Sequence, residues 1–137
     1  MRRYHGFLIC LFLFCGCGKA QDFIPDVPVN FTAPLTDPRL SPLNTVGGAV
    51  IINGYGVSGI IISKTPFGEF VAYDRTSSVN PQQRCAVVLE SGLFTVTDPC
   101  SGAKFSLLDG SPAKAPAVRS LKHYTVSISG IVLHVTN

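Results

Sequence analysis

Two cysteines lead the short set of residues in this chain that could do chemistry. Beyond residue 17 the sequence contains only two thiols, Cys85 and Cys100. In an oxidising compartment, two thiols in one small domain usually form a disulfide. Closing a loop of roughly 15 residues would stabilise the fold by about 3 kcal/mol. Two free thiols are the alternative, and composition alone leaves that alternative open.

Hydroxyl and charged side chains near these cysteines lack the partners that catalysis requires. Ser77, Ser78 and Ser101 could act as nucleophiles only beside a base, and no histidine stands near them in the sequence. Asp74 and Arg75 could clamp a ligand, but we expect an ion pair that holds their loop. We therefore expect structural roles for these residues in preference to catalytic ones.

The remaining candidates are one acid and two histidines. We expect Asp98, which opens a loop, to accept hydrogen bonds from backbone N–H groups. His123 and His134 fall in the last pair of apolar segments, and His134 alternates with apolar neighbours, which favours the surface for both. If Cys85 and Cys100 are bonded, the sequence beyond residue 17 offers no thiolate for a soft metal. We therefore predict no metal site.

Short apolar segments separated by turn residues must position these groups. Thirteen glycines and ten prolines indicate many turns, and no stretch of ten residues has a helical period. Asn53-Gly54, Ser91-Gly92 and Ser129-Gly130 are hairpin signals. The pattern predicts an all-β fold, an antiparallel sandwich or small barrel. Its strands are expected at 48–52, 57–63, 69–74, 85–89, 93–97, 104–107, 124–127 and 131–135.

The amino terminus has the pattern of an export signal. A positive start precedes an apolar run at Phe7–Phe14, which at eight residues is too short to span a bilayer. The cysteines that follow resemble a bacterial lipobox. Cys17 follows the small Gly16, whereas Cys15 follows a bulky phenylalanine, so Cys17 is the expected lipidation site. Residues 1–16 would then be a lipoprotein-type signal peptide, with an ordinary signal peptide as the alternative.

The rest of the chain divides into a proline-rich stretch and a β domain. Residues 17–45 are expected to form a tether and an edge segment, in which 27–31 lies against the domain, and residues 46–137 form the domain. The expected compartment is the cell envelope, where a lipid anchor would attach the protein to a membrane on the periplasmic side or at the cell surface. From Cys17 onward nine Lys and Arg face eight Asp and Glu, which gives no electrostatic case for a nucleic-acid partner.

The surroundings of Cys100 resemble a known family. The run Asp98–Phe105, D-P-C-S-G-A-K-F, is similar to the second cluster-binding box of Rieske iron–sulfur proteins, C-P-C-H-G-S-x-F. Asp109-Gly110-Ser111 and Ala115-Pro116-Ala117 follow in register, and the closing hairpin completes the match. The resemblance covers about residues 46–135. It implies a Rieske-like antiparallel fold with two cluster-binding loops.

The resemblance also implies that these loops are degenerate. A Rieske [2Fe–2S] centre takes two cysteine thiolates and two histidine imidazoles. Asp98 and Ser101 stand at the ligand positions of the second box, and Ser77 and Val79 are the equivalents in the first. Cys85 and Cys100 correspond to the two cysteines that form the family's disulfide between the loops.

Three functions remain open on this interpretation. The first is a membrane-anchored envelope lipoprotein that has no cofactor, serves as a structural or interaction module for an unknown envelope partner and is not expected to be an enzyme. The second is a [2Fe–2S] electron-transfer protein, as the family resemblance implies by default. The third is a ligand or enzymatic site at the old loops, lined by Asp74, Arg75, Asp98 and Ser101.

Overall fold

The computed structural model describes residues 23–92 and 94–137, which form two antiparallel sheets and two short 3-10 helices. The first part of the chain contains β1 (Asn30–Pro34), η1 (Pro38–Asn44), β2 (Ala49–Ile52), β3 (Ile60–Lys64), β4 (Phe70–Asp74) and η2 (Pro81–Gln83). The second part contains β5 (Val88–Leu89), β6 (Thr95–Thr97), β7 (Lys104–Ser106), β8 (Pro112–Lys114), β9 (His123–Ser129) and β10 (Val132–Thr136).

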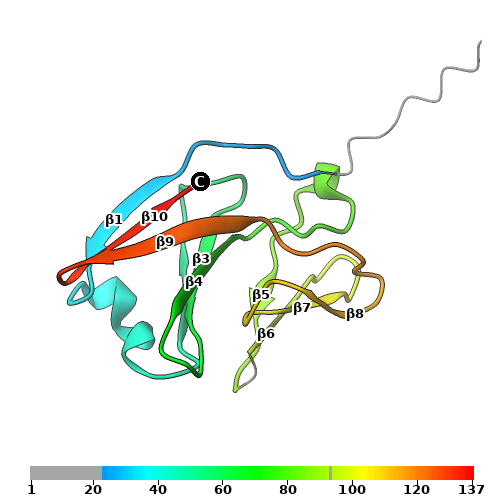
Figure 1. Ribbon diagram of the computed structural model, residues 1–137. Helices are drawn as coiled ribbons and strands as arrows, with labels where there is room; N and C mark the ends of the chain where they lie inside the picture. The colour runs from blue at the N-terminus through cyan, green and yellow to red at the C-terminus, as the bar shows by residue number, and fades with distance from the viewer. Residues whose placement is uncertain (1–22, 93) are drawn as a thin grey trace, which may run out of the picture.

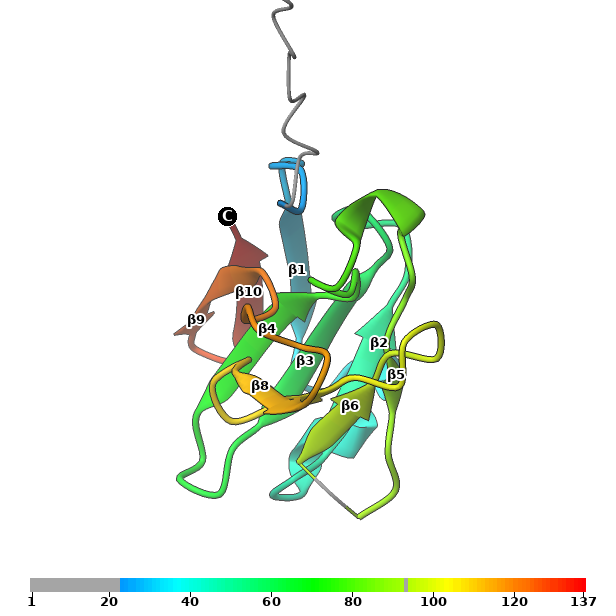
Figure 2. The same ribbon diagram turned by 90° about the vertical axis from the view of Figure 1, so that its right-hand side faces the viewer.

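The larger sheet joins the two ends of the folded chain. Its strand order is β1-β10-β9-β4-β3-β2, and the sheet curls strongly, as the two views show (Figures 1 and 2). The first strand pairs with the last, with Phe31 opposite Val135. The smaller sheet, β5-β6-β7-β8, lies beside β3 and β4 and carries one of the loops of interest.

The strands β3 and β4 are buried on both faces, because one face of each strand packs against one core and the opposite face packs against a second core. Along β3 the side chains of Ile60 and Ile62 enter the core inside the curled sheet, whereas Ile61 enters the core under the smaller sheet. Alternation along a strand produces this division, since successive side chains point to opposite faces. Tyr73 and Phe105 fill the second core, and both are fully buried. The loops that follow β4 and β6 therefore start from a rigid base.

The all-β antiparallel prediction is confirmed, and most of the expected strands are present with ends shifted by a few residues. The small strand β8 was not expected, since Pro112–Lys114 is exposed and carries no apolar alternation. The proline-rich stretch was expected to form only a tether and an edge segment, yet η1 forms there. Pro38 occupies its first turn, where no backbone N–H is needed, and the Asp37 side chain caps it.

The folded unit also begins earlier than the boundary expected at residue 46. Leu40 and Leu43 of η1 are buried in the first core, and β1 upstream of them is a full edge strand of the sheet. The expected edge segment at 27–31 is displaced towards the carboxyl side, to Asn30–Pro34. The signal peptide at 1–16 and Cys17 lie outside the described residues. Within 23–92 and 94–137, no helix has the length and apolarity needed to cross a bilayer.

Candidate functional site

The candidate site lies where the loop after β4 meets the loop between β6 and β7. Ser77 belongs to the first loop, and its backbone N–H donates to the carbonyl of Cys85 (2.8 Å). In the second loop the Asp98 carbonyl accepts from Gly102 N, and Asp98 N donates to Ala103 O, both at 2.8 Å. Gly102 has a positive φ of 76°, which this tight turn requires.

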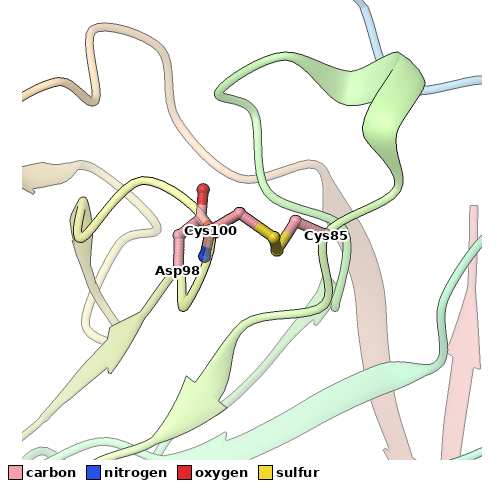
Figure 3. Close-up of side chains that lie close together, drawn as sticks. All are labelled: Cys85, Asp98 and Cys100. Atoms are coloured by element: carbon pink, nitrogen blue, oxygen red, sulfur yellow. A yellow bond between two sulfur atoms is a disulfide. The ribbon is translucent and has the colours of Figure 1, made fainter.

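A disulfide ties the two loops together, as predicted. Cys85 and Cys100 are bonded to each other, and their Cα atoms lie 6.3 Å apart. Figure 3 shows that the bridge runs between the loop below η2 and the loop that Asp98 opens, with the Asp98 side chain beside it. The Cys85 side of the bridge is buried, whereas Cys100 is exposed.

The Asp98 carboxylate is the centre of the hydrogen bonds at the junction of the two loops. Its Oδ2 accepts from the hydroxyls of Ser77 and Ser101, both at 2.7 Å, and its Oδ1 accepts from the backbone N–H of Cys100 at 2.8 Å. The side chain of Ser77 in turn accepts from the N–H of Val79 (3.1 Å). Three of the four residues expected at ligand positions are thus hydrogen-bonded through their side chains to one another.

This arrangement keeps Asp98 ionised although only 1% of the residue is exposed. Burial raises the pKa of the carboxyl group, but the hydrogen bonds from Ser101, Ser77 and the Cys100 backbone together outweigh it and leave the pKa below its usual value. The expected backbone N–H acceptance by Asp98 is confirmed, with the two hydroxyls added.

Asp74 organises a second buried network beside the first loop. Its carboxylate accepts from the N–H groups of Val57 (2.7 Å) and Thr76 (2.8 Å) and from the hydroxyl of Tyr124 (2.7 Å). Burial and the hydrogen bond to Asp74 raise the pKa of Tyr124 above its ordinary value, so the phenol stays protonated as a donor. The expected ion pair with Arg75 is wrong, since Arg75 Nε donates instead to the carbonyl of Val87 (2.9 Å).

The sequence did not indicate that Tyr124 belongs to this network. The residue is 50 positions from Asp74 and reaches it only because β4 and β9 pair, with Ala72 opposite Tyr124. The one available signal was chemical. A tyrosine predicted in a core strand needs a partner for its hydroxyl group.

The histidines lie away from the two loops, in positions that suit structural roles. The ring of His123 donates to the carbonyl of Asp109 (2.8 Å) and packs edge-on against Tyr73. His134 hydrogen-bonds Thr32 across the β1–β10 pair at 3.2 Å. His123 is exposed as expected, and His134 is partly buried.

Ser78 points out of the network and links the site to a neighbouring loop. Its hydroxyl donates to the carbonyl of Arg119 at 2.7 Å. A groove of about 310 Å³ runs beside this contact, lined by Phe23, Ile24, Ser78, Pro81, Arg119, Ser120 and Lys122. The groove opens to solvent next to the loops, whereas Asp74 and Asp98 face protein groups.

The comparisons place this geometry in a known fold. At 22% identity, the cyanobacterial plasma membrane Rieske protein PetC3 from Synechocystis PCC 6803 superposes with a TM-score of 0.57, over 80% of this chain and 98% of that one. The domain has a Rieske-like fold. The ferredoxin of carbazole 1,9a-dioxygenase from Nocardioides aromaticivorans IC177 agrees, with a TM-score of 0.53 at 16% identity over 80% of this chain and 97% of the other. No protein-family model and no curated protein matches the sequence.

The residues at the loops do not fit the cluster that this fold carries in Rieske proteins. The described cysteines, Cys85 and Cys100, are bonded to each other, although their sulfur atoms and an Asp98 oxygen lie within 4.8 Å of one another. The described histidines are engaged at other places. The hydroxyls and the carboxylate that face each other between the loops are hard oxygen donors, whereas a Rieske centre needs two thiolates and two imidazoles.

Proposed function

We propose that this chain is a lipid-anchored envelope protein whose Rieske-like domain works without an iron–sulfur cluster, as a structural or interaction module. One observation carries the proposal. The Asp98 carboxylate accepts a hydrogen bond from each loop, through Ser77 on one side and Ser101 on the other. The hydrogen bond from Ser77 to Asp98 joins the two loops without a metal, and the bonds from Ser101 and Cys100 hold the carboxylate in place for it.

The chemistry of the substituted positions supports this proposal. Ser77, Val79, Asp98 and Ser101 stand at the ligand positions in the sequence match, and none of them is a cysteine or histidine. The disulfide between Cys85 and Cys100 uses the described thiols. The scaffold of the site is thus kept together by covalent and hydrogen bonds that need no metal.

The hydrogen bonds already made by the two buried carboxylates argue against a catalytic pocket at the loops. Asp74 and Asp98 each accept three hydrogen bonds from protein donors. A general base or a ligand clamp would have to give up one of these partners first. We therefore place binding, to a membrane and to an envelope protein, above catalysis.

The metal content of the full-length protein, purified from membranes, tests the cofactor-free assignment. We expect no stoichiometric iron, no acid-labile sulfide and no visible absorption band. The alternative is electron transfer through a [2Fe–2S] cluster, which the fold similarity favours. Stoichiometric iron and sulfide with a coloured spectrum would establish that alternative and overturn our proposal.

The anchor is tested separately through the two candidate cysteines. Cys17→Ala should release the protein from membranes and remove the mass of the attached lipid, because Cys17 is the proposed acceptor. Cys15→Ala is the matched control and should leave both unchanged. Membrane retention of the Cys17 variant with its lipid mass intact would refute the assignment.

A further inference from the structure

The chain leaves the folded domain at a fixed place, beside the candidate site. Phe23 and Pro81 line the same groove, so the start of the described chain lies against η2 (Figure 1). Hydrogen bonds hold the next residues against the domain. Lys122 Nζ donates to Asp26 (2.6 Å) and to the carbonyl of Pro25 (3.2 Å), and the side chain of Asn137 accepts from Val29 N (2.8 Å).

The proposed anchor is close to this exit along the chain. Six peptide steps separate Cys17 from Phe23, which at full extension reach about 21 Å. A domain of this size has a radius of gyration of about 13 Å, hence a diameter of about 35 Å if it is treated as a sphere. A tether shorter than the domain keeps the side that carries the exit nearest the membrane.

The surface around the exit has the chemistry of a bilayer contact. Two apolar side chains stand out into solvent there, Phe23 at 58% and Val118 at 85% exposed. Arg84 and Arg119 are exposed beside them and add positive charge, and Lys122 pairs with Asp26. Between Cys17 and Phe23 the sequence adds one lysine and one aspartate, which cancel. Apolar side chains among basic ones favour an interface that bears anionic lipid.

We propose that this exit face, formed by Phe23, Arg84, Val118 and Arg119, rests on a bilayer surface with anionic phosphate headgroups. The proposal rests on the lipid anchor at Cys17. It assigns an orientation, with the loops of the candidate site turned towards the membrane and the β3–β4 turn pointing away. A soluble partner would then reach the outer surface of the domain and not these loops.

The two most exposed of the other large apolar side chains do not compete for this role. Phe67, 88% exposed, lies in the β3–β4 turn at the end of the molecule opposite η2 in both views (Figures 1 and 2). Ile131, 61% exposed, lies in the β9–β10 hairpin, where no arginine or lysine is near in sequence. The tether joins the domain at the exit face, so this face lies nearest to the proposed anchor.

The absence of tryptophan from the sequence allows a direct test of this orientation. Val118→Trp and Phe67→Trp introduce single reporters at two similarly exposed positions, one on the exit face and one at the opposite end. Each lipidated full-length protein is reconstituted into phosphatidylcholine–phosphatidylglycerol vesicles that contain brominated lipid. We expect a blue-shifted, quenched emission for the reporter at 118 and unquenched, solvent-like emission for the reporter at 67.

The outcomes separate this proposal from the one on which it rests. Protein that fails to float with the vesicles and lacks the lipid mass shows that the anchor is wrong. Protein that floats, carries lipid and shows equal quenching of both reporters, or quenching only at 67, overturns the orientation alone.

A charge variant tests the headgroup chemistry without a risk to folding. Arg84 has φ 51°, a left-handed conformation that glycine adopts without a steric penalty, so Arg84→Gly removes the charge while suiting the backbone. Combined with Val118→Trp, it should lower the ratio of membrane-docked to undocked domain about fivefold in anionic vesicles, as reported by quenching of the reporter at 118. Arg39→Gln, a loss of the same charge in η1, should change nothing. Equal effects of the two variants, or no effect of anionic lipid, would overturn the assignment to anionic headgroups.

Discussion

At the residue scale, the carboxylate of Asp98 is the point where the two loops meet. Asp98 has only two side-chain oxygen atoms, yet it receives donors from both loops and from the backbone of its own turn. Each bond is charge-assisted, and such bonds are stronger than bonds between neutral groups. Asp74 repeats the arrangement at the base of the first loop.

Replacing Asp98 by asparagine should destabilise the domain by about 2–4 kcal/mol at neutral pH, because an amide cannot accept from all three donors in this buried site. The pKa of Asp98 is lowered in the folded state, so its contribution is complete above the unfolded-state value near pH 4 and is lost as pH falls through the folded-state pKa. Denaturant unfolding at several pH values should therefore show the difference from wild type shrinking in acid.

Asp109→Asn is the control for that experiment. Asp109 also has a lowered pKa, caused first by its hydrogen bonds from Ser111, but the residue is exposed. Its loss should change the free energy of unfolding by less than about 0.5 kcal/mol. A difference between wild type and Asp98→Asn that stays constant with pH would contradict the role given to the ionised carboxylate.

Gly56 illustrates how closely the Asp74 network is packed. Its φ is +63°, and an added Cβ atom would lie 2.3 Å from Asp74 Oδ2 and 2.8 Å from the hydroxyl of Tyr124. Gly56→Ala should cost about 3 kcal/mol or more in the free energy of unfolding, through backbone strain and displacement of a buried hydrogen bond. Gly54→Ala has a comparable positive φ but open space around it, so it should cost only the backbone strain. Similar losses for the two variants would refute the packing argument.

At the element scale, the two loops behave as one unit because a covalent bond and a hydrogen-bond network join them. The first loop follows β4 and the second lies between β6 and β7, in different sheets. The curled sheet and the smaller sheet also meet through the second core and through the hydrogen bond from the Tyr73 hydroxyl to the Leu107 carbonyl. The disulfide between Cys85 and Cys100 is the strongest of these connections.

Reduction of this disulfide should lower the stability by about 3 kcal/mol and the melting temperature by about 10 °C, since it releases a loop with a sequence separation of 15 residues. Thermal unfolding with and without a phosphine reductant measures the effect. The double variant Cys85→Ala, Cys100→Ala should melt near the reduced protein and not respond to the reductant. Equal melting of the reduced and oxidised protein would contradict a structural role for the bond.

The elements were predictable where local pattern decides them. The run Ile60–Ile62 indicated a central strand, and Ser91-Gly92 indicated the β5–β6 hairpin, because side-chain burial and turn chemistry act over a few residues. Strand β8 escaped prediction because pairing with β7, not its own sequence, makes it a strand. The partners within the site escaped for the same reason. Ser77 and Asp98 are 21 residues apart, and nothing local shows that their side chains meet.

At the scale of the whole molecule, the first described residues are held by the last one. Asn137 donates through Nδ2 to Asp26 (3.1 Å) and to the carbonyl of Val27 (3.2 Å), and its Oδ1 accepts from Val29 N. Together with the β1–β10 pair, these bonds fix where the chain enters the fold. The orientation proposed above depends on this attachment.

Asn137→Ala should loosen the entry segment and leave the core intact. The amide of Val29 loses its acceptor and should exchange with solvent faster, whereas the amide of Phe31 or Ile61 should keep its protection. Hydrogen exchange followed by NMR measures each amide separately. Unchanged exchange at Val29, or faster exchange throughout both cores, would show that Asn137 does not stabilise the entry segment locally.

The pairing of β1 with β10 also sets when this protein can fold. Phe31 and Val135 are opposite each other in the sheet, so the strand that is synthesised earlier must wait for its later partner. A chain still emerging from the ribosome lacks that partner and cannot close the curled sheet. Under the export proposed above, this delay keeps the sheet open until β10 is available. Assembly of the sheet is thereby timed to the release of its last strand.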